Sequence, residues 1–233
     1  ATSTALPVIP LRDDNPIRGM PVVTIALIAI SAAVYLWQLS LPAQSAQAAV
    51  YLLGFMPALL FGYATFDGAQ WVPPGATILT SMFLHGSFLH LAGNMLYLWI
   101  FGDNIEDRVG HGRFVVFYLL CGAFAALAQA LSDTHSTIPM IGASGAVSGI
   151  LGAYVVLYPR ANVLVAVPLL IVLYTVRVPA LVVLGLWFGA QLLSSLALES
   201  GAGGVAFLAH VGGFIAGVAL IRWFLRERRG ARS

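Results

Sequence analysis

The chain has 233 residues, of which 60% are hydrophobic and 9% are charged, with a formal net charge of +2. Soluble domains contain roughly 45–50% apolar residues even when glycine is counted, whereas this chain exceeds that share before its 24 glycines are added. The composition excludes a water-soluble globule, a disordered chain and a nucleic-acid-binding protein, and the single cysteine, Cys121, excludes an internal disulfide. We therefore predict a helical bundle in a lipid bilayer.

Apolar stretches between polar breaks predict six membrane spans, because a transmembrane helix needs roughly 20 mainly apolar residues. The spans are expected near residues 21–41, 87–105, 113–131, 143–158, 179–198 and 205–225. Residues 1–233 are expected to form a single membrane domain, an all-α polytopic bundle of six helices. A long outer loop, 42–86, follows the first span, and a loop of this length is more often functional than idle.

The arginines predict how the bundle is threaded. With a cytoplasmic N-terminus, all cationic residues lie in inner tails or loops, as the positive-inside rule requires: Arg12, Arg18, Arg108, Arg113, Arg160, Arg177, Arg222, Arg226, Arg228, Arg229 and Arg232. The loops after the first, third and fifth spans contain Asp67, Asp133 and Glu199 and no arginine. Both termini are thus expected in the cytoplasm. Residues 1–20 are polar and are not expected to act as a signal peptide.

Two further apolar runs are too short to span a membrane as ordinary helices. Residues 49–63 and 163–176 are each about 15 residues long, and each contains a proline, Pro57 or Pro168. If both were spans, Arg108, Arg113 and Arg160 would lie outside. We therefore predict that both runs lie in the membrane interface or dip into the bundle.

Polar side chains within the predicted spans mark candidate chemistry, because a polar group in hydrocarbon is costly. At 1.5 Å per residue, His90 and Asn94 lie roughly 5 and 10 Å along their span, and Ser144 and His210 lie roughly 3 and 8 Å below the outer surface. These four side chains are therefore expected at one depth. Two further polar residues lie within spans, namely Ser148 and Gln191.

Paired small residues predict that the fourth and sixth spans pack closely. Small residues four positions apart allow membrane helices to approach backbone to backbone. They are Gly145 and Gly149 in the fourth span and Gly213 and Gly217 in the sixth. Such packing would bring Ser144 and His210 within hydrogen-bond reach, as activation of a serine nucleophile requires.

The same residues could support acyl transfer. Backbone N–H groups in the first turn of the fourth span, together with His90 and Asn94, could stabilise an oxyanion. No acidic residue lies in a span at the depth of His210, so we predict a Ser–His dyad and no Ser–His–Asp triad. Taken singly, Ser144 could be a packing residue, and His90 and Asn94 could simply bond across helices.

Three segments resemble the signature segments of the rhomboid intramembrane serine proteases. They are HLAGNM at 90–95, GASGAVSG at 142–149 and AHVGGFIAG at 209–217, which match the family in order and in span. The segment GDNIEDRVG at 102–110 also resembles the family motif G-x-x-x-E-x-x-x-G. The resemblance covers residues 20–225 and implies a six-helix bundle whose water-accessible cavity opens to the outside.

The resemblance also implies roles for individual residues. By matching positions, Ser144 is the nucleophile, His210 is the base and acid, and His90, Asn94 and the Ser144 backbone N–H form the oxyanion hole. Glu106 and Arg108 form a structural group at the inner end of the second span. The implied enzyme needs no cofactor or metal and cleaves transmembrane protein substrates in or beside their spans. Its expected location is the cell membrane, as a multi-pass protein of a prokaryotic plasma membrane.

The sequence departs from the family pattern at two places. Some rhomboids carry a tyrosine four residues after the nucleophile, stacked on the catalytic histidine, where this chain has Ser148. Some have a Trp-Arg pair in the first outer loop, where Trp71 is followed by Val72. The resemblance further suggests that the fifth span, which contains Trp187, borders the route by which substrate reaches the site.

Other classes of function remain as alternatives. A catalytically inactive rhomboid-like chaperone for membrane proteins would keep the fold, and a small transporter would predict paired charges or an inverted repeat, which the sequence lacks. A metalloprotease would need a motif such as H-E-x-x-H, and His85, His90 and His210 fit no zinc pattern. An aspartyl intramembrane protease would need two buried aspartates, and the predicted spans supply none.

Overall fold

A computed structural model describes residues 9–66, 72–169, 172–197 and 207–225. Asp67, Trp71, Glu199 and the arginines after residue 225 lie outside the described residues, as does the side chain of Gln191. The protein is a mostly helical membrane protein.

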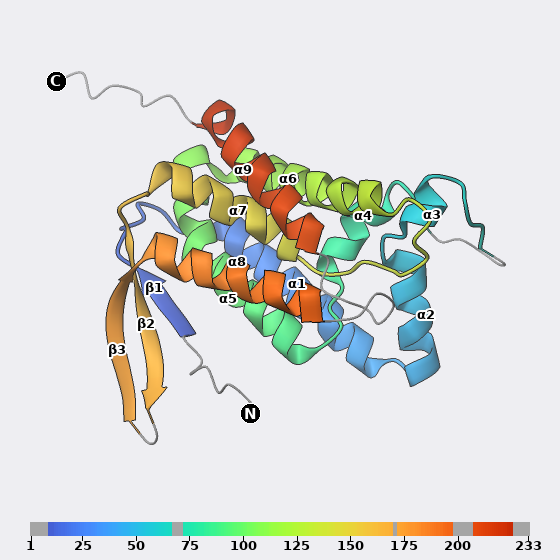
Figure 1. The fold of residues 1–233 in the computed structure, drawn as a ribbon, viewed down its shortest axis with the longest axis horizontal. Coiled ribbons are helices and arrows are strands. Elements are labelled where there is room, and N and C mark those ends of the chain that lie inside the picture. Colours follow the sequence, from blue (N-terminus) through green and yellow to red (C-terminus); the bar gives the residue numbers. More distant parts are fainter. Residues whose placement is uncertain (1–8, 67–71, 170–171, 198–206, 226–233) are drawn as a thin grey trace.

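Six helices coincide with the six predicted spans to within a few residues (Figure 1). They are α1 (Val22–Ser40), α5 (Phe88–Val109), α6 (His111–Ser132), α7 (Ser144–Leu157), α8 (Ala180–Ala197) and α9 (Phe207–Phe224). Among the described residues, α1, α6 and α9 are long and apolar enough to cross a membrane, and α7 and the first part of α8 are shorter apolar helices. The last turns of α5 carry acidic residues and an arginine, which lowers its mean hydropathy.

The long loop after α1 is folded into short helices at one end of the bundle (Figure 1). They are α2 (Ala43–Leu53), α3 (Pro57–Leu60), α4 (Thr77–Thr80) and the 3-10 helix η1 (Ser81–Phe83). Pro57 is the first residue of α3, where its missing N–H costs nothing, so the run 49–63 divides between two helices. Phe55 and Met140 exchange two backbone hydrogen bonds of 3.0 and 2.8 Å, which tie this loop to the segment before α7.

The prediction of an all-α fold is wrong at the run 163–176. These residues belong to an antiparallel pair of strands, β2 (Asn162–Leu169) and β3 (Val172–Pro179), and β1 (Ile9–Asp13) completes a sheet with the order β1-β2-β3. The physical reason is that Val163 and Val165 alternate on one face and are fully buried in the main hydrophobic core. Val163 and Val165 therefore pack against the helices, whereas Tyr174 and Val176 of β3 are 53% and 46% exposed on a sheet that projects beyond the bundle (Figure 1).

The sheet constrains the threading of the chain. Ile9 pairs with Ala166 and Asp13 with Val163, so the segment before α1 lies against the connection between α7 and α8. Any threading through a membrane must therefore place these two segments on one side.

A buried carboxylate fixes the start of α1 against the end of α5. Glu106 is 1% exposed, and its two oxygens accept hydrogen bonds from the backbone N–H groups of Val23 (2.9 Å) and Thr24 (2.8 Å) and from the Thr24 hydroxyl (2.7 Å). His111 Nδ1 also contacts this carboxylate. Because the first N–H groups of a helix lack intrahelical partners, a negative charge here satisfies and stabilises the helix. Arg108 lies 6.0 Å from the centre of the Tyr158 ring.

Replacing Glu106 by glutamine should destabilise the protein by about 1–3 kcal/mol, because the new amide group would face backbone donors that need an acceptor. The measurement is the unfolding free energy in detergent. The matched control is Asp107→Asn on the same turn, since Asp107 accepts a single exposed hydrogen bond from the Arg18 backbone and should change stability little. Equal stability losses in both variants would contradict a capping role for Glu106.

Candidate active site

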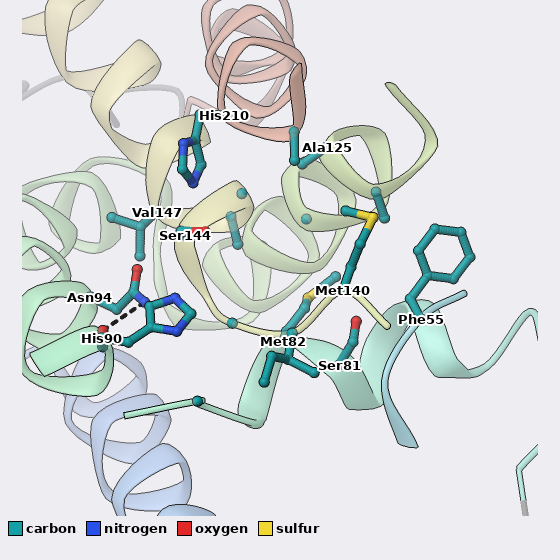
Figure 2. Close-up of a pocket in the computed structure, with 18 of the residues that line it drawn as sticks. Phe55, Ser81, Met82, His90, Asn94, Ala125, Met140, Ser144, Val147 and His210 are labelled. Carbon is teal, nitrogen blue, oxygen red and sulfur yellow. Dashed lines mark hydrogen bonds between the residues drawn. The ribbon is translucent and has the colours of Figure 1, made fainter. Parts of the chain in front are cut away.

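The four polar residues expected at one depth line a single cavity of about 630 Å³. His90 and Asn94 come from α5, Ser144 is the first residue of α7, and His210 lies in α9. Figure 2 shows all four side chains around the cavity, with His210 and Ser144 towards α9 and α7 and His90 beside Asn94. The far part of the cavity is apolar, lined by residues that include Phe55, Met82 and Met140.

Glycines allow α7 and α9 to touch through their backbones. The carbonyl oxygens of Gly145 and Gly149 occupy the space that a Cβ on Gly213 and Gly217 would need. In the other direction, a Cβ on Gly149 would lie 3.1 Å from the Gly213 carbonyl oxygen. Since only glycine fits at these contacts, the two helices approach more closely than helices with side chains could. Ser144 and His210 lie at the end of this contact that faces the cavity.

His210 is almost completely buried, at 3% exposure, yet its ring has no hydrogen-bond partner that fixes it. The Nδ1 atom is buried and bonds to none of the described residues, and no described carboxylate forms an ion pair with His210. The described residues also include no hydrogen bond between Ser144 Oγ and His210. Hydrogen bonds of catalytic pairs are often long in a free enzyme and tighten when substrate binds.

Ser144 begins α7 after a turn that requires glycine. Gly142 has a φ of +119°, and a Cβ there would lie 2.7 Å from the His90 Cε1 and Nε2 atoms. The Gly142 N–H donates to the Ser81 carbonyl at 2.8 Å, which anchors the turn to η1. The first intrahelical bond of α7 runs from Val147 N to Ala143 O, so the N–H groups of residues 144–146 have no helical partner.

His90 and Asn94 share one face of α5, as their spacing predicts. The Ser87 hydroxyl caps this helix by accepting from the His90 N–H at 3.2 Å. Asn94 Nδ2 donates to the His90 carbonyl at 2.9 Å, the dashed line in Figure 2. One N–H of the Asn94 amide is therefore used within α5, and the second is the donor that an oxyanion would require.

His85 lies in the loop before α5 and packs against His90. It is 1% exposed, its ring lies edge-on to His90 with centroids 5.2 Å apart, and its Nδ1 bonds to the Phe83 carbonyl at 3.2 Å. Its backbone N–H donates to Gln38 in α1 at 3.1 Å. Burial, assisted by the neighbouring His90, lowers the pKa of His85 to about 4. His85 is therefore a neutral side chain behind His90 at physiological pH.

The sequence placed Trp187 in a span that borders the substrate route, but its contact with His210 was not predicted. Trp187 lines the cavity from α8, and its ring lies 5.4 Å from the His210 ring. The signal in the sequence that could have indicated this contact was an aromatic residue in a span that borders the site. His111 and His135 lie outside the cavity, and the residues that the structure describes contain no cluster of three His, Cys, Asp or Glu able to hold a metal.

The chain is thus a helical membrane protein with a serine at the start of α7 and a buried histidine of α9 in one cavity. The two helices that carry them pack through glycines. The comparison with protein families identifies the class of protein: the Rhomboid domain model matches residues 74–227, which covers most of the chain. The chain belongs to the rhomboid family.

Curated relatives carry the same family name. The chain is 30% identical over 167 residues to "Rhomboid protein 1, mitochondrial" of Saccharomyces cerevisiae, covering 68% of this chain and 44% of that protein. It is 35% identical over 145 residues to "Rhomboid protease GluP" of Bacillus subtilis, covering 61% and 25%. "Putative rhomboid protease YdcA" of Bacillus subtilis is 29% identical over 153 residues, covering 64% and 68%. The chain thus spans less than half the length of the first two relatives.

Substituting Gly217 by alanine should lower the thermal unfolding midpoint markedly, because the new methyl group would meet the Gly149 backbone, which cannot move without separating α7 from α9. The loss of stability should be about 2 kcal/mol or more. The control is Gly189→Ala in α8, where no atom lies within 4 Å of the added Cβ. Alanine there should leave stability unchanged or raise it by about 0.5–1 kcal/mol. Similar unfolding midpoints for the two variants would contradict backbone contact between the helices.

Proposed function

We propose that this protein is an intramembrane serine endopeptidase that cleaves other membrane proteins within or beside their transmembrane segments. Ser144 is the nucleophile and His210 is the general base and acid. The observation that carries the proposal is the meeting of Ser144, His210, His90 and Asn94 in one cavity at the N-terminal end of α7. Membership of the rhomboid family and relatives named as proteases support it.

In the proposed reaction, His210 accepts the proton of Ser144 Oγ as the oxygen attacks the carbonyl carbon of the scissile peptide bond. The negative charge that develops on the carbonyl oxygen is stabilised by the Ser144 N–H and by the side chains of His90 and Asn94. His210 then gives its proton to the leaving amine, which breaks the C–N bond and leaves an acyl group on Ser144. Water, activated by the same imidazole, hydrolyses this ester.

The substrate must present an extended peptide bond to this site. The N–H and C=O groups of a helical segment are bonded within the helix, so its peptide bonds are inaccessible to a nucleophile. The proposed substrates are therefore transmembrane segments that unwind easily, with small or helix-breaking residues near the cleavage point. The apolar part of the cavity, around Met82 and Met140, offers space for apolar side chains of the unwound segment.

In the proposed threading, both termini lie on the cytoplasmic side of a cell membrane. The chain crosses this membrane six times, by α1, α5, α6, α7, α8 and α9. Residues 1–233 then act as one membrane domain whose partners are substrate proteins and the lipid bilayer. This arrangement puts every arginine on the inner side and opens the cavity near the outer side. The pairing of β1 with β2 supports it, since both strands then lie in the cytoplasm.

Two other functions compete with this proposal. An inactive rhomboid-like chaperone would bind membrane proteins without cutting them, and a small transporter would move a solute through the bundle. Neither function requires a serine and a histidine in one cavity beside unpaired N–H groups.

Labelling by a fluorophosphonate probe tests the nucleophile. The purified wild type should be labelled, Ser144→Ala should not, and His210→Ala should react at least about 100-fold more slowly, because general-base catalysis contributes this much. Ser148→Ala is the matched control, since Ser148 lies one turn further along α7 and its hydroxyl donates to the Ser144 carbonyl at 2.7 Å. Labelling that persists in Ser144→Ala contradicts the assignment.

The same proteins in liposomes separate the functions. Cleavage of a transmembrane test substrate by the wild type and not by Ser144→Ala supports a peptidase. Substrate binding without cleavage by the wild type would favour the chaperone.

Cleavage should slow as the pH falls, because a protonated imidazole cannot accept the serine proton. Stability should fall as well between pH 6.5 and about pH 4, because in this window His85 binds a proton in the unfolded chain and not in the folded one. The measurement is kcat against pH, with the unfolding midpoint recorded in each buffer. A rate that rises as the pH falls, while the protein remains folded, would contradict catalysis by a neutral histidine.

A further inference from the structure

The orientation of the His210 ring needs a cause. In a serine–histidine–aspartate site, the carboxylate holds the imidazole in place through Nδ1. Here Nδ1 of His210 is buried and bonds to none of the described residues, so none of them holds the ring through this atom. A base must still be held in position if it is to accept the Ser144 proton. Packing is therefore left to orient this imidazole.

Ser148 cannot supply that packing. It is fully buried in α7, and its hydroxyl donates to the Ser144 carbonyl at 2.7 Å, which directs the short side chain along its own helix. The ring that lies against His210 comes instead from α8. Trp187 has its centroid 5.4 Å from the imidazole, with 49° between the ring planes, a distance at which aromatic rings attract each other.

Trp187 also packs against a second aromatic ring, that of Tyr97. Its ring lies 5.7 Å from that of Tyr97 in α5, so three rings in a row connect α5, α8 and α9. Trp187 is half-buried and reaches the cavity, whereas the neighbouring Phe188 packs 4.9 Å from Phe214 in α9. Apart from such ring contacts, α8 touches α7 and α9 far less than those two helices touch each other.

We propose that Trp187 is a positioning residue that holds the His210 imidazole towards Ser144, in the place where Ser148 offers no ring. This inference rests on the proposed peptidase function. Its consequence is that the competence of the base depends on the position of α8. When α8 moves away from the bundle, the indole leaves the imidazole, and Ser144 loses its oriented base until α8 returns.

The test compares Trp187→Ala, Trp187→Phe and Phe188→Ala with the wild type. Two reactions are followed that do not require a transmembrane substrate to pass α8, namely the rate of labelling by a fluorophosphonate probe and the cleavage of a short soluble fluorogenic peptide. We expect Trp187→Ala to lower the labelling rate and kcat by about 5- to 10-fold with KM nearly unchanged. Trp187→Phe keeps a ring against His210 and should recover to within about 3-fold of the wild type.

Phe188→Ala is the control, because its ring packs against Phe214 in α9 and against Trp187, with centroids 4.9 and 5.0 Å apart, but makes no ring contact with His210 among the described residues. It should stay within about 2-fold of the wild type in both reactions. An unfolding midpoint measured for each variant separates loss of fold from loss of positioning.

Three results overturn the inference. One is an unchanged or higher labelling rate in Trp187→Ala, which means that the indole acts only on substrate access. Another is equal losses in Trp187→Ala and Phe188→Ala, and the third is a loss in Trp187→Phe as large as in Trp187→Ala. If the wild type itself is not labelled and cleaves nothing, the proposed function fails, which is a different outcome from an active wild type with an unaffected Trp187→Ala.

Discussion

Direct contact between the backbones of α7 and α9 is the constraint on which the site depends. A membrane offers little hydrophobic force between helices, so their association relies on close packing, and glycine permits the closest. Gly213 and Gly217 leave room for the carbonyl oxygens of Gly145 and Gly149, and a single added methyl group would collide with backbone. Ser144 and His210 lie at the end of this contact that faces the cavity, so the distance between them is set by the packing of glycines.

The two ends of the bundle are built differently. At the end that carries the sheet, the buried Glu106 caps α1, and the half-buried Asp13 accepts hydrogen bonds from Tyr154 at 2.6 Å and Asn104 at 3.0 Å. At the end that carries the cavity, His210 Nδ1 bonds to none of the described residues, and the Asn94 amide uses one N–H within α5. Buried polar groups that are fully satisfied make a structure rigid, whereas unsatisfied ones are available for chemistry.

The positions of the six helices and the shared cavity could be predicted because polar residues and paired glycines are rare in spans, and each one is therefore informative. The sheet could not be predicted, because a short apolar run reads the same whether it forms strands such as β2 or an interfacial helix. The contact between Trp187 and His210 was also missed. It depends on how α8 is rotated against α9, and the pattern of apolar residues in α8 does not set that rotation, since both its faces are apolar.

The sheet also bears on the order in which the chain is made. β1 precedes α1 in the chain, yet its partner β2 follows α7, so β1 has no partner strand while the helices between them are made. Unpaired strand edges are sites of aggregation and of recognition by other chains. Closure of the sheet must wait until residues 162–169 have been made, so it is a late step of folding.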